Sequence, residues 1–127
     1  MKKISLLIDT NVIIDYLRNN AQAADYLENL SASIVLSTIS VAEIYAGIRN
    51  GAEEQTVENL LRTMIILPVD HAIASVGGSF CKKYKNSHGV GLADALIAAT
   101  AQQHEAILVT LNTKHFPMVK TVKPYNK

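Results

Sequence analysis

Several residue types are scarce in this chain. Its 127 residues include no tryptophan, a single cysteine (Cys81) and only three prolines, and aromatic side chains make up 6% of the total. One cysteine excludes an internal disulfide framework and fits a reducing compartment. No aromatic-rich segment indicates base stacking, so the sequence predicts no nucleotide preference.

Charge of one sign and long apolar runs are also absent. Twelve Lys/Arg against eleven Asp/Glu give a formal net charge of +1, so a nucleic-acid partner would have to be bound by a local patch or through a metal ion. No segment approaches the roughly 18 apolar residues of a membrane span. The apolar run after Met1-Lys2-Lys3 is interrupted by Asp9, which leaves it too short for a signal peptide. We therefore expect a cytoplasmic protein without a membrane partner.

Short apolar runs alternate with segments of helical periodicity along the whole chain. The composition, 49% hydrophobic and 18% charged, is typical of a globular protein, and the length fits a single domain covering residues 1–127. The alternation predicts a three-layer α/β/α domain around a largely parallel sheet of four to five strands. Strands are expected at residues 4–8, 34–36, 64–68 and 106–110, with a short edge strand at 121–123; helices at 12–18, 21–30, from 40 to about 50, 53–64, 72–84 and 92–103; and a loop at 85–91.

Asp9 stands where the first buried strand ends and the first helix begins. In open parallel sheets this carboxyl edge is where ligands bind. An unpaired charge there is costly, so a cation is one explanation. The other explanation is an ordinary helix N-cap, since Asp is a favoured capping residue, and both can hold together.

Eight of the eleven acids, including Asp15, fit polar helix faces, helix ends or caps. Besides Asp9, two other acids do not. Asp94 lies in the first turn of a helix that is otherwise apolar. The positive helix terminus would offset only about 0.3–1 kcal/mol of the cost of burying it. Glu43 is spaced from Ser40 as in a capping box, although Ala46 and Gly47 beside it leave room for another group. Asp9, Glu43 and Asp94 together suit Mg²⁺, which takes carboxylate oxygens.

Four segments resemble the motifs of the PIN-domain ribonucleases, especially the VapC-type toxins of bacterial and archaeal toxin–antitoxin pairs. They are residues 8–17 (IDTNVIIDYL), 40–47 (SVAEIYAG), 92–101 (LADALIAATA) and 108–116 (LVTLNTKHF). Each motif alone is weak, but four in order across nearly the whole chain are specific. The sequence shows no phosphate-binding loop, Cys/His metal motif or Gly-x-Ser-x-Gly elbow that would indicate other chemistry.

The resemblance implies an endoribonuclease that depends on Mg²⁺ or Mn²⁺ and hydrolyses RNA phosphodiester bonds with a metal-activated water. Asp9, Glu43 and Asp94 would be the catalytic metal ligands, and Thr10 and Asn11 would order the first carboxylate. The implied partners are the RNA substrate and a cognate antitoxin, and the implied assembly is a homodimer.

The fourth motif departs from the family pattern. The family often has an acid just before the phenylalanine, whereas this chain has His115 before Phe116; Thr110 and Asn112 remain as neutral polar groups at the same edge. His115 has three open roles: an Mn²⁺ ligand, a general acid, or a cap at the strand end. With three carboxylates we expect one firmly held ion, so calorimetric titration of Mg²⁺ without RNA should show one site at most.

Basic residues offer a route for RNA. Lys82, Lys83, Lys85 and His88 precede the helix that carries Asp94, and Lys114 lies in the fourth motif. A solvated helix end explains them equally well. Each true phosphate contact would steepen the salt dependence of binding by about one unit.

Two rival functions remain open. One is a catalytically weak PIN-like domain that only binds RNA or protein, which a cleavage assay sensitive to EDTA would separate from an enzyme. The other is a phosphate-accepting receiver domain, because Asp9 ends a strand in an α/β sheet. Receiver domains normally show an acidic pair near the first strand and a lysine after the last, and neither is evident here.

Overall fold

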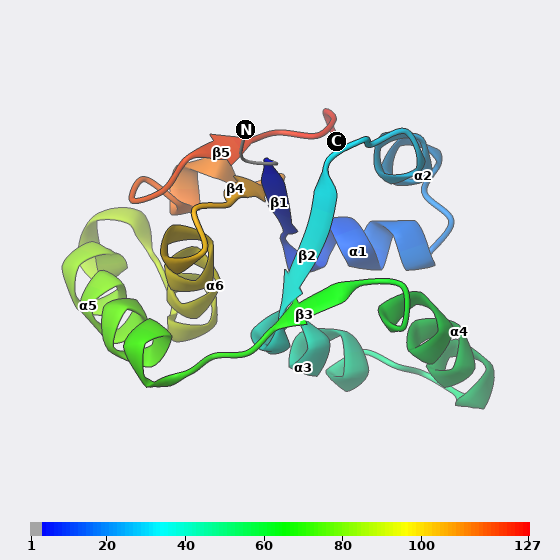
Figure 1. The fold of residues 1–127 in the computed structure, drawn as a ribbon, viewed down its shortest axis with the longest axis horizontal. Coiled ribbons are helices and arrows are strands. Elements are labelled where there is room, and N and C mark those ends of the chain that lie inside the picture. Colours follow the sequence, from blue (N-terminus) through cyan, green and yellow to red (C-terminus); the bar gives the residue numbers. More distant parts are fainter. Residues whose placement is uncertain (1–3) are drawn as a thin grey trace.

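A five-stranded, fully parallel sheet forms the centre of the computed structural model, which describes residues 4–127. The strands lie in the order β3-β2-β1-β4-β5 (Figure 1). Their bounds are β1 Ser5–Ile8, β2 Ser33–Ser37, β3 Ile65–Leu67, β4 Ile107–Val109 and β5 Thr121–Val122. The predicted parallel sheet is confirmed, including its short fifth strand at an edge.

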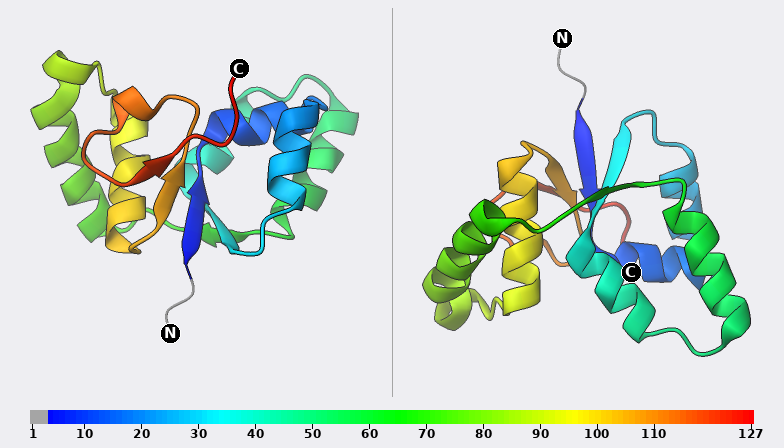
Figure 2. Two further views of the ribbon diagram at one scale, coloured as in Figure 1. Left: turned by 90° about the horizontal axis from the view of Figure 1, so that it is seen from above. Right: turned by 60° about the horizontal axis from the view of Figure 1, so that its bottom comes forward.

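Helices cover both faces of this sheet (Figures 1 and 2). One layer contains α1, α2, α3 and α4, and the other contains α5 and α6. The helices are α1 Thr10–Leu17, α2 Ala21–Glu28, α3 Thr38–Ala46, α4 Gly51–Leu61, α5 His71–His88 and α6 Leu92–Gln103, with a short 3-10 turn η1 at Thr113–His115. The predicted three-layer α/β/α class is confirmed.

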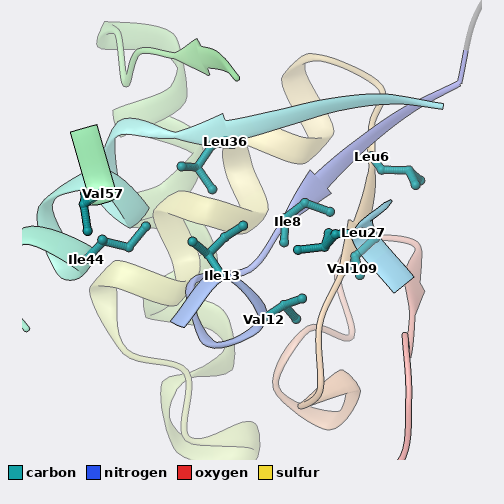
Figure 3. Packing of buried hydrophobic residues seen from close by; sticks show 9 residues of the cluster. All are labelled: Leu6, Ile8, Val12, Ile13, Leu27, Leu36, Ile44, Val57 and Val109. Atoms are coloured by element: carbon teal, nitrogen blue, oxygen red, sulfur yellow. The ribbon is translucent and has the colours of Figure 1, made fainter. Parts of the chain in front are cut away.

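Alternation along β1 explains why both faces need a helical layer. Leu6 and Ile8 belong to the cluster beneath α1 to α4, whereas Leu7 belongs to the cluster beneath α6 (Figure 3 shows the first cluster). Successive side chains of a strand point to opposite faces, so an apolar run without alternation must be covered on both. The sheet is thereby held rigidly at the edge where Asp9 follows β1.

Two predicted helix boundaries differ from the structure. The helix expected at 72–84 continues as α5 to His88, so the expected loop at 85–91 is mostly helical and shortens to the residues around Gly89, which ends α5 with φ of 65°. The helix expected from 40 to about 50 instead runs from Thr38 to Ala46 as α3, and the Asn50 side chain caps the N-terminus of α4.

Asp15 was assigned to a polar helix face or end, and it lies in the last turn of α1, but its side chain is not left to solvent. Its side chain is only 12% exposed and accepts hydrogen bonds from Tyr125 at 2.8 Å and Lys127 at 2.7 Å. The C-terminal residues are thus fastened across α1. No sequence periodicity reveals a partner more than one hundred positions away.

No helix in residues 4–127 is long and apolar enough to cross a membrane. The leading Met1-Lys2-Lys3, considered above as part of a signal peptide, lies outside the described residues.

The direction of chain crossing reverses between β1 and β4. The chain passes from β1 outward to β2 and β3, then returns to the other side of β1 to form β4 and β5. Ile8 is paired with Val109, and the Asp9 N–H donates to the Val109 carbonyl at 2.9 Å. Ligands of open α/β sheets bind at such a switch point, outside the carboxyl ends of the strands.

Candidate functional site

Asp9 lies at the switch point and is 5% exposed. It caps α1, as predicted: its Oδ1 accepts from the Thr10 N–H at 2.8 Å. Its Oδ2 accepts from the Thr110 hydroxyl at 2.7 Å, which joins the ends of β1 and β4. Capping and a ligand role are compatible because an ionised carboxylate has about four acceptor positions, two of which are used here.

Thr10 connects the first carboxylate to Glu43. Its hydroxyl oxygen lies 2.7 Å from Glu43 Oε1 and 2.8 Å from Ser40 Oγ. A hydroxyl has one hydrogen and a carboxylate only accepts, so Thr10 donates to Glu43 and accepts from Ser40. This relay from Ser40 through Thr10 orients Glu43 toward the α1 terminus, across the carboxyl ends of β1 and β2.

Ser40 is a site residue that the sequence assigned to a different role. The capping-box explanation for Ser40 and Glu43 is wrong, because Ser37 is the N-cap and α3 already begins at Thr38. Ser40 lies inside the helix, fully buried, and pairs with Thr10 rather than with the α3 backbone. In the sequence, the signal for this site role is a serine about one helical turn before an acid.

Asp94 occupies the first turn of α6, at the same edge of the sheet. Its Oδ2 lies 3.7 Å from Nδ1 of His115, the last residue of η1, and the two side chains are 36% and 38% exposed. Asp94 also acts electrostatically on Asp9. The turn after β4 therefore brings His115 to the solvent side of the acid group, rather than into a cap of the strand.

The three acids influence one another. Burial raises the pKa of Asp9 above its ordinary 3.8, and the negative charges of Asp94 and Glu43 raise it further, although hydrogen bonds from Thr110 and Thr10 oppose the shift. Both desolvation and like charge disfavour the ionised form of an acid. A cation would relieve both costs, and an acid whose pKa is raised by burial and by like charges at a sheet edge is a candidate functional residue.

A metal ion fits this donor set in its chemistry. Three carboxylates, with the hydroxyl hydrogens of Thr10 and Thr110 holding two of them in place, are the oxygen ligands that Mg²⁺ and Mn²⁺ prefer. Within residues 4–127, however, no three His, Cys, Asp or Glu side chains are grouped tightly enough to hold an ion as they stand. Binding would therefore draw the exposed Glu43 inward toward the fixed Asp9.

Of the predicted supporting residues, Thr10 and Thr110 contact the acid group directly. Asn112 contributes through its backbone, whose N–H donates to the Thr110 hydroxyl at 3.1 Å. Asn11 is exposed, and across the described chain no hydrogen bond joins its side chain to Asp9.

The basic residues singled out in the sequence are all solvent-exposed. Lys82, Lys83, Lys85 and His88 lie along the last turns of α5, and Lys114 lies in η1. Lys83 is placed over the Tyr84 ring, 5.3 Å from its centroid. Their role in RNA binding stays a prediction.

The fold and the site together define the class: an α/β protein with a parallel sheet covered on both faces and acids near its switch point, where such proteins bind their ligands. The family model of the PIN domain matches residues 6–120. The chain belongs to the PIN domain family.

Similar proteins cover almost the same length. Ribonuclease VapC10 of Mycobacterium tuberculosis is 38% identical over 122 residues, covering 94% of this chain and 91% of that protein. Toxin FitB of Neisseria gonorrhoeae is 33% identical over 126 residues, covering 87% and 90%. A solved toxin-antitoxin complex from Klebsiella pneumoniae has a chain that matches with a TM-score of 0.84 at 32% identity, covering 96% of this chain and 99% of that one.

Proposed function

We propose that this protein is an endoribonuclease and the toxin of a toxin–antitoxin pair. The observation that carries the proposal is the placement of Asp9, Glu43 and Asp94 near the switch point, where Thr110 binds Asp9, Thr10 binds Glu43 and the charge of Asp94 acts on Asp9. The ribonuclease and toxin relatives, similar over nearly their whole length, support the substrate class.

The cofactor in this proposal is Mg²⁺ or Mn²⁺, held by Asp9, Glu43 and Asp94. When bound, such an ion supplies charge neutralisation at the phosphodiester and lowers the pKa of a water for attack. The chain's own contribution is orientation: Thr110 and the α1 backbone fix Asp9, and the Ser40–Thr10 relay holds Glu43.

An RNA cleavage assay tests the activity. The purified chain should cut RNA with added Mg²⁺ or Mn²⁺, lose the activity in EDTA and regain it on addition of either metal. Asp94→Asn should reduce the rate by at least a hundredfold while the thermal melt is retained. Asp70→Asn is the matched control, because the Asp70 side chain caps α5 by accepting from the Ile73 N–H and bonds to none of the three acids or their hydroxyl partners. Equal rates for Asp94→Asn and the wild type, or a preparation inactive with both metals, would leave a binding module as the better account.

The proposed partner is an antitoxin that carries an apolar segment. A hollow of about 280 Å³ lies between α1, α3 and α4. Its walls include Ile14, Leu17, Ile48 and Val57. Titration with the protein encoded by the adjacent reading frame should give a stable complex that Ile48→Glu weakens. A titration without heat change or mobility shift would contradict the pairing.

The proposed assembly of the chain itself is a homodimer. Sedimentation velocity of the purified chain should then give twice the chain mass.

A further inference from the structure

His115 is placed beside the acid group by a well-anchored turn. Its backbone N–H donates to the Asn112 carbonyl at 3.1 Å, and the next residue, Phe116, is 2% exposed and packs in the cluster beneath α6. Asn112 is in turn tied to the Thr110 hydroxyl, which binds Asp9. The turn that carries the His115 imidazole is therefore anchored by backbone hydrogen bonds and by the buried Phe116.

The distance between His115 and Asp94 is informative. Nδ1 and Oδ2 are 3.7 Å apart, which is too long for a hydrogen bond between them. Two donors that bind one ion at about 2.1 Å each are roughly 3 Å apart at a right angle and about 4.2 Å apart when opposite. The observed separation falls between these limits, so both atoms can bind one ion without changing their separation.

Access to this pair is open from solvent. The side chains of Asp94 and His115 are 36% and 38% exposed, whereas Asp9 behind them is 5% exposed. Within residues 4–127 the His115 ring contacts only Asp94 among charged or hydrogen-bonding partners, so a ring nitrogen is free to act as a donor atom. An ion entering from solvent would meet the pair first.

We propose that His115 is a metal ligand that binds through an imidazole nitrogen next to Asp94 and makes the site prefer Mn²⁺ over Mg²⁺. The inference rests on the metal site of the proposed function. Mg²⁺ takes oxygen ligands and gives up its waters reluctantly, whereas imidazole nitrogen suits transition-metal ions. A nitrogen donor in an otherwise carboxylate site therefore discriminates between the two ions.

Pulsed electron paramagnetic resonance of Mn²⁺ tests the ligand directly. The tag-free full chain is stripped with EDTA and loaded with less than one equivalent of Mn²⁺. The wild type should show ¹⁴N modulation from one directly bound imidazole, which needs no variant and so does not depend on any variant folding. Bound Mn²⁺ without ¹⁴N coupling would overturn the inference while leaving the metal site of the proposed function intact.

Variants then identify the histidine. His115→Gln should abolish the ¹⁴N signal and weaken Mn²⁺ binding about tenfold, with Mg²⁺ binding changed less than twofold. His104→Gln is the matched control, since this exposed histidine follows α6 at its far end from Asp94, and it should change neither. Coupling that persists in His115→Gln would assign the nitrogen to another of the four histidines and refute the proposal.

An absence of Mn²⁺ binding would also refute it, and the cleavage assay described above would then decide separately whether the ribonuclease proposal survives. Equal loss of Mn²⁺ and Mg²⁺ affinity in His115→Gln would show that the histidine only supports the site and does not discriminate between the ions.

Discussion

Asp9 has two properties that shift its pKa in opposite directions. It is a buried carboxylate with like charges near it, and it is also a helix cap with two strong hydrogen bonds. Because burial and the neighbouring acids raise its pKa, the folded state binds a proton at Asp9 more tightly than the unfolded state does. Ionised Asp9 therefore costs stability in the absence of a cation.

Replacing Asp9 with Asn should raise the stability of the metal-free protein at pH 7 by about 1 kcal/mol. The gain should be complete above the raised pKa of Asp9 and disappear as the pH falls to about 3.8, where the carboxyl group is protonated even in the unfolded chain. Urea unfolding in EDTA between pH 4 and 8 measures it. Added Mn²⁺ should stabilise the wild type and not the variant, and an Asn variant less stable than wild type in EDTA would be evidence against this electrostatic account.

In the hydrogen-bond relay from Ser40 through Thr10 to Glu43, loss of the Thr10 hydroxyl should affect metal binding more than loss of the Ser40 hydroxyl. Thr10→Val removes the donor to Glu43, so Mn²⁺ affinity and cleavage rate should each fall by about 10–100-fold with little change in melting temperature. Ser40→Ala leaves the Thr10 donor in place and should cost less than tenfold. Kinetics and Mn²⁺ titration on both variants check the order, and a Ser40→Ala effect as large as that of Thr10→Val would contradict it.

At the scale of elements, the chain's apolar patterning indicated most of the fold. The runs at 4–8, 34–36 and 106–110 predicted buried strands because nothing but a sheet covered on both faces accommodates them. The polar last turn of α5 was missed because Lys85 to His88 carry no apolar periodicity; tertiary context and the Gly89 cap extend the helix there. Local pattern therefore determines which elements form better than where they end.

Two adjacent glycines in α5 illustrate how helices are spaced. A methyl group added at Gly77 would lie 2.6 Å from Leu96 Cδ2 and 3.2 Å from Leu96 Cα, whereas one added at Gly78 would meet nothing within 4 Å. Gly77 therefore sets how closely α5 and α6 pack, and α6 carries Asp94.

Gly77→Ala should destabilise the protein by about 1–3 kcal/mol through overpacking. Gly78→Ala should stabilise it by about 0.5–1 kcal/mol, since alanine restricts the unfolded chain and favours helix. Chemical denaturation of the two variants side by side provides the comparison. Equal effects would mean that the α5–α6 contact is not limiting.

The candidate site was predicted in its acids and not in its connections. Asp9 was indicated by its position after a strand and Asp94 by its position in an apolar helix, whereas Glu43 was indicated only together with these two and by the motif resemblance. Ser40 and the partners of Asp15 were not, because hydrogen bonds between elements leave no periodic trace in the sequence. Buried positions can be predicted because they recur periodically along the chain. Which polar side chains pair with one another depends on how the fold brings distant elements together.

At the scale of the whole molecule, the C-terminus is fastened to the first helix. Burial alone would raise the pKa of Asp15, but the hydrogen bonds from Lys127 and Tyr125 and the charge of Lys127 outweigh it and hold the pKa below 3.8. The contact therefore stabilises the fold above that pH and is lost as the pH falls through the lowered value.

Tyr125→Phe should cost about 1 kcal/mol at pH 7, because it removes a hydrogen bond to a charged group that is largely shielded from water. Lys127→Ala should cost less, since the Lys127 side chain is 57% exposed and its charge is screened by solvent. Thermal unfolding at pH 7 and pH 2.5 should show the Tyr125 difference shrinking in acid. A difference independent of pH would assign the effect to packing instead.

The central claim is that Asp9, Glu43 and Asp94, from three separate elements, share one divalent ion. The most direct measurement is anomalous diffraction from crystals of the full chain grown with Mn²⁺. The account predicts one strong peak at the switch point, about 2.1–2.2 Å from oxygens of Asp9 and Asp94, with Glu43 drawn toward it. Manganese bound elsewhere, with these carboxylates still apart, would contradict it.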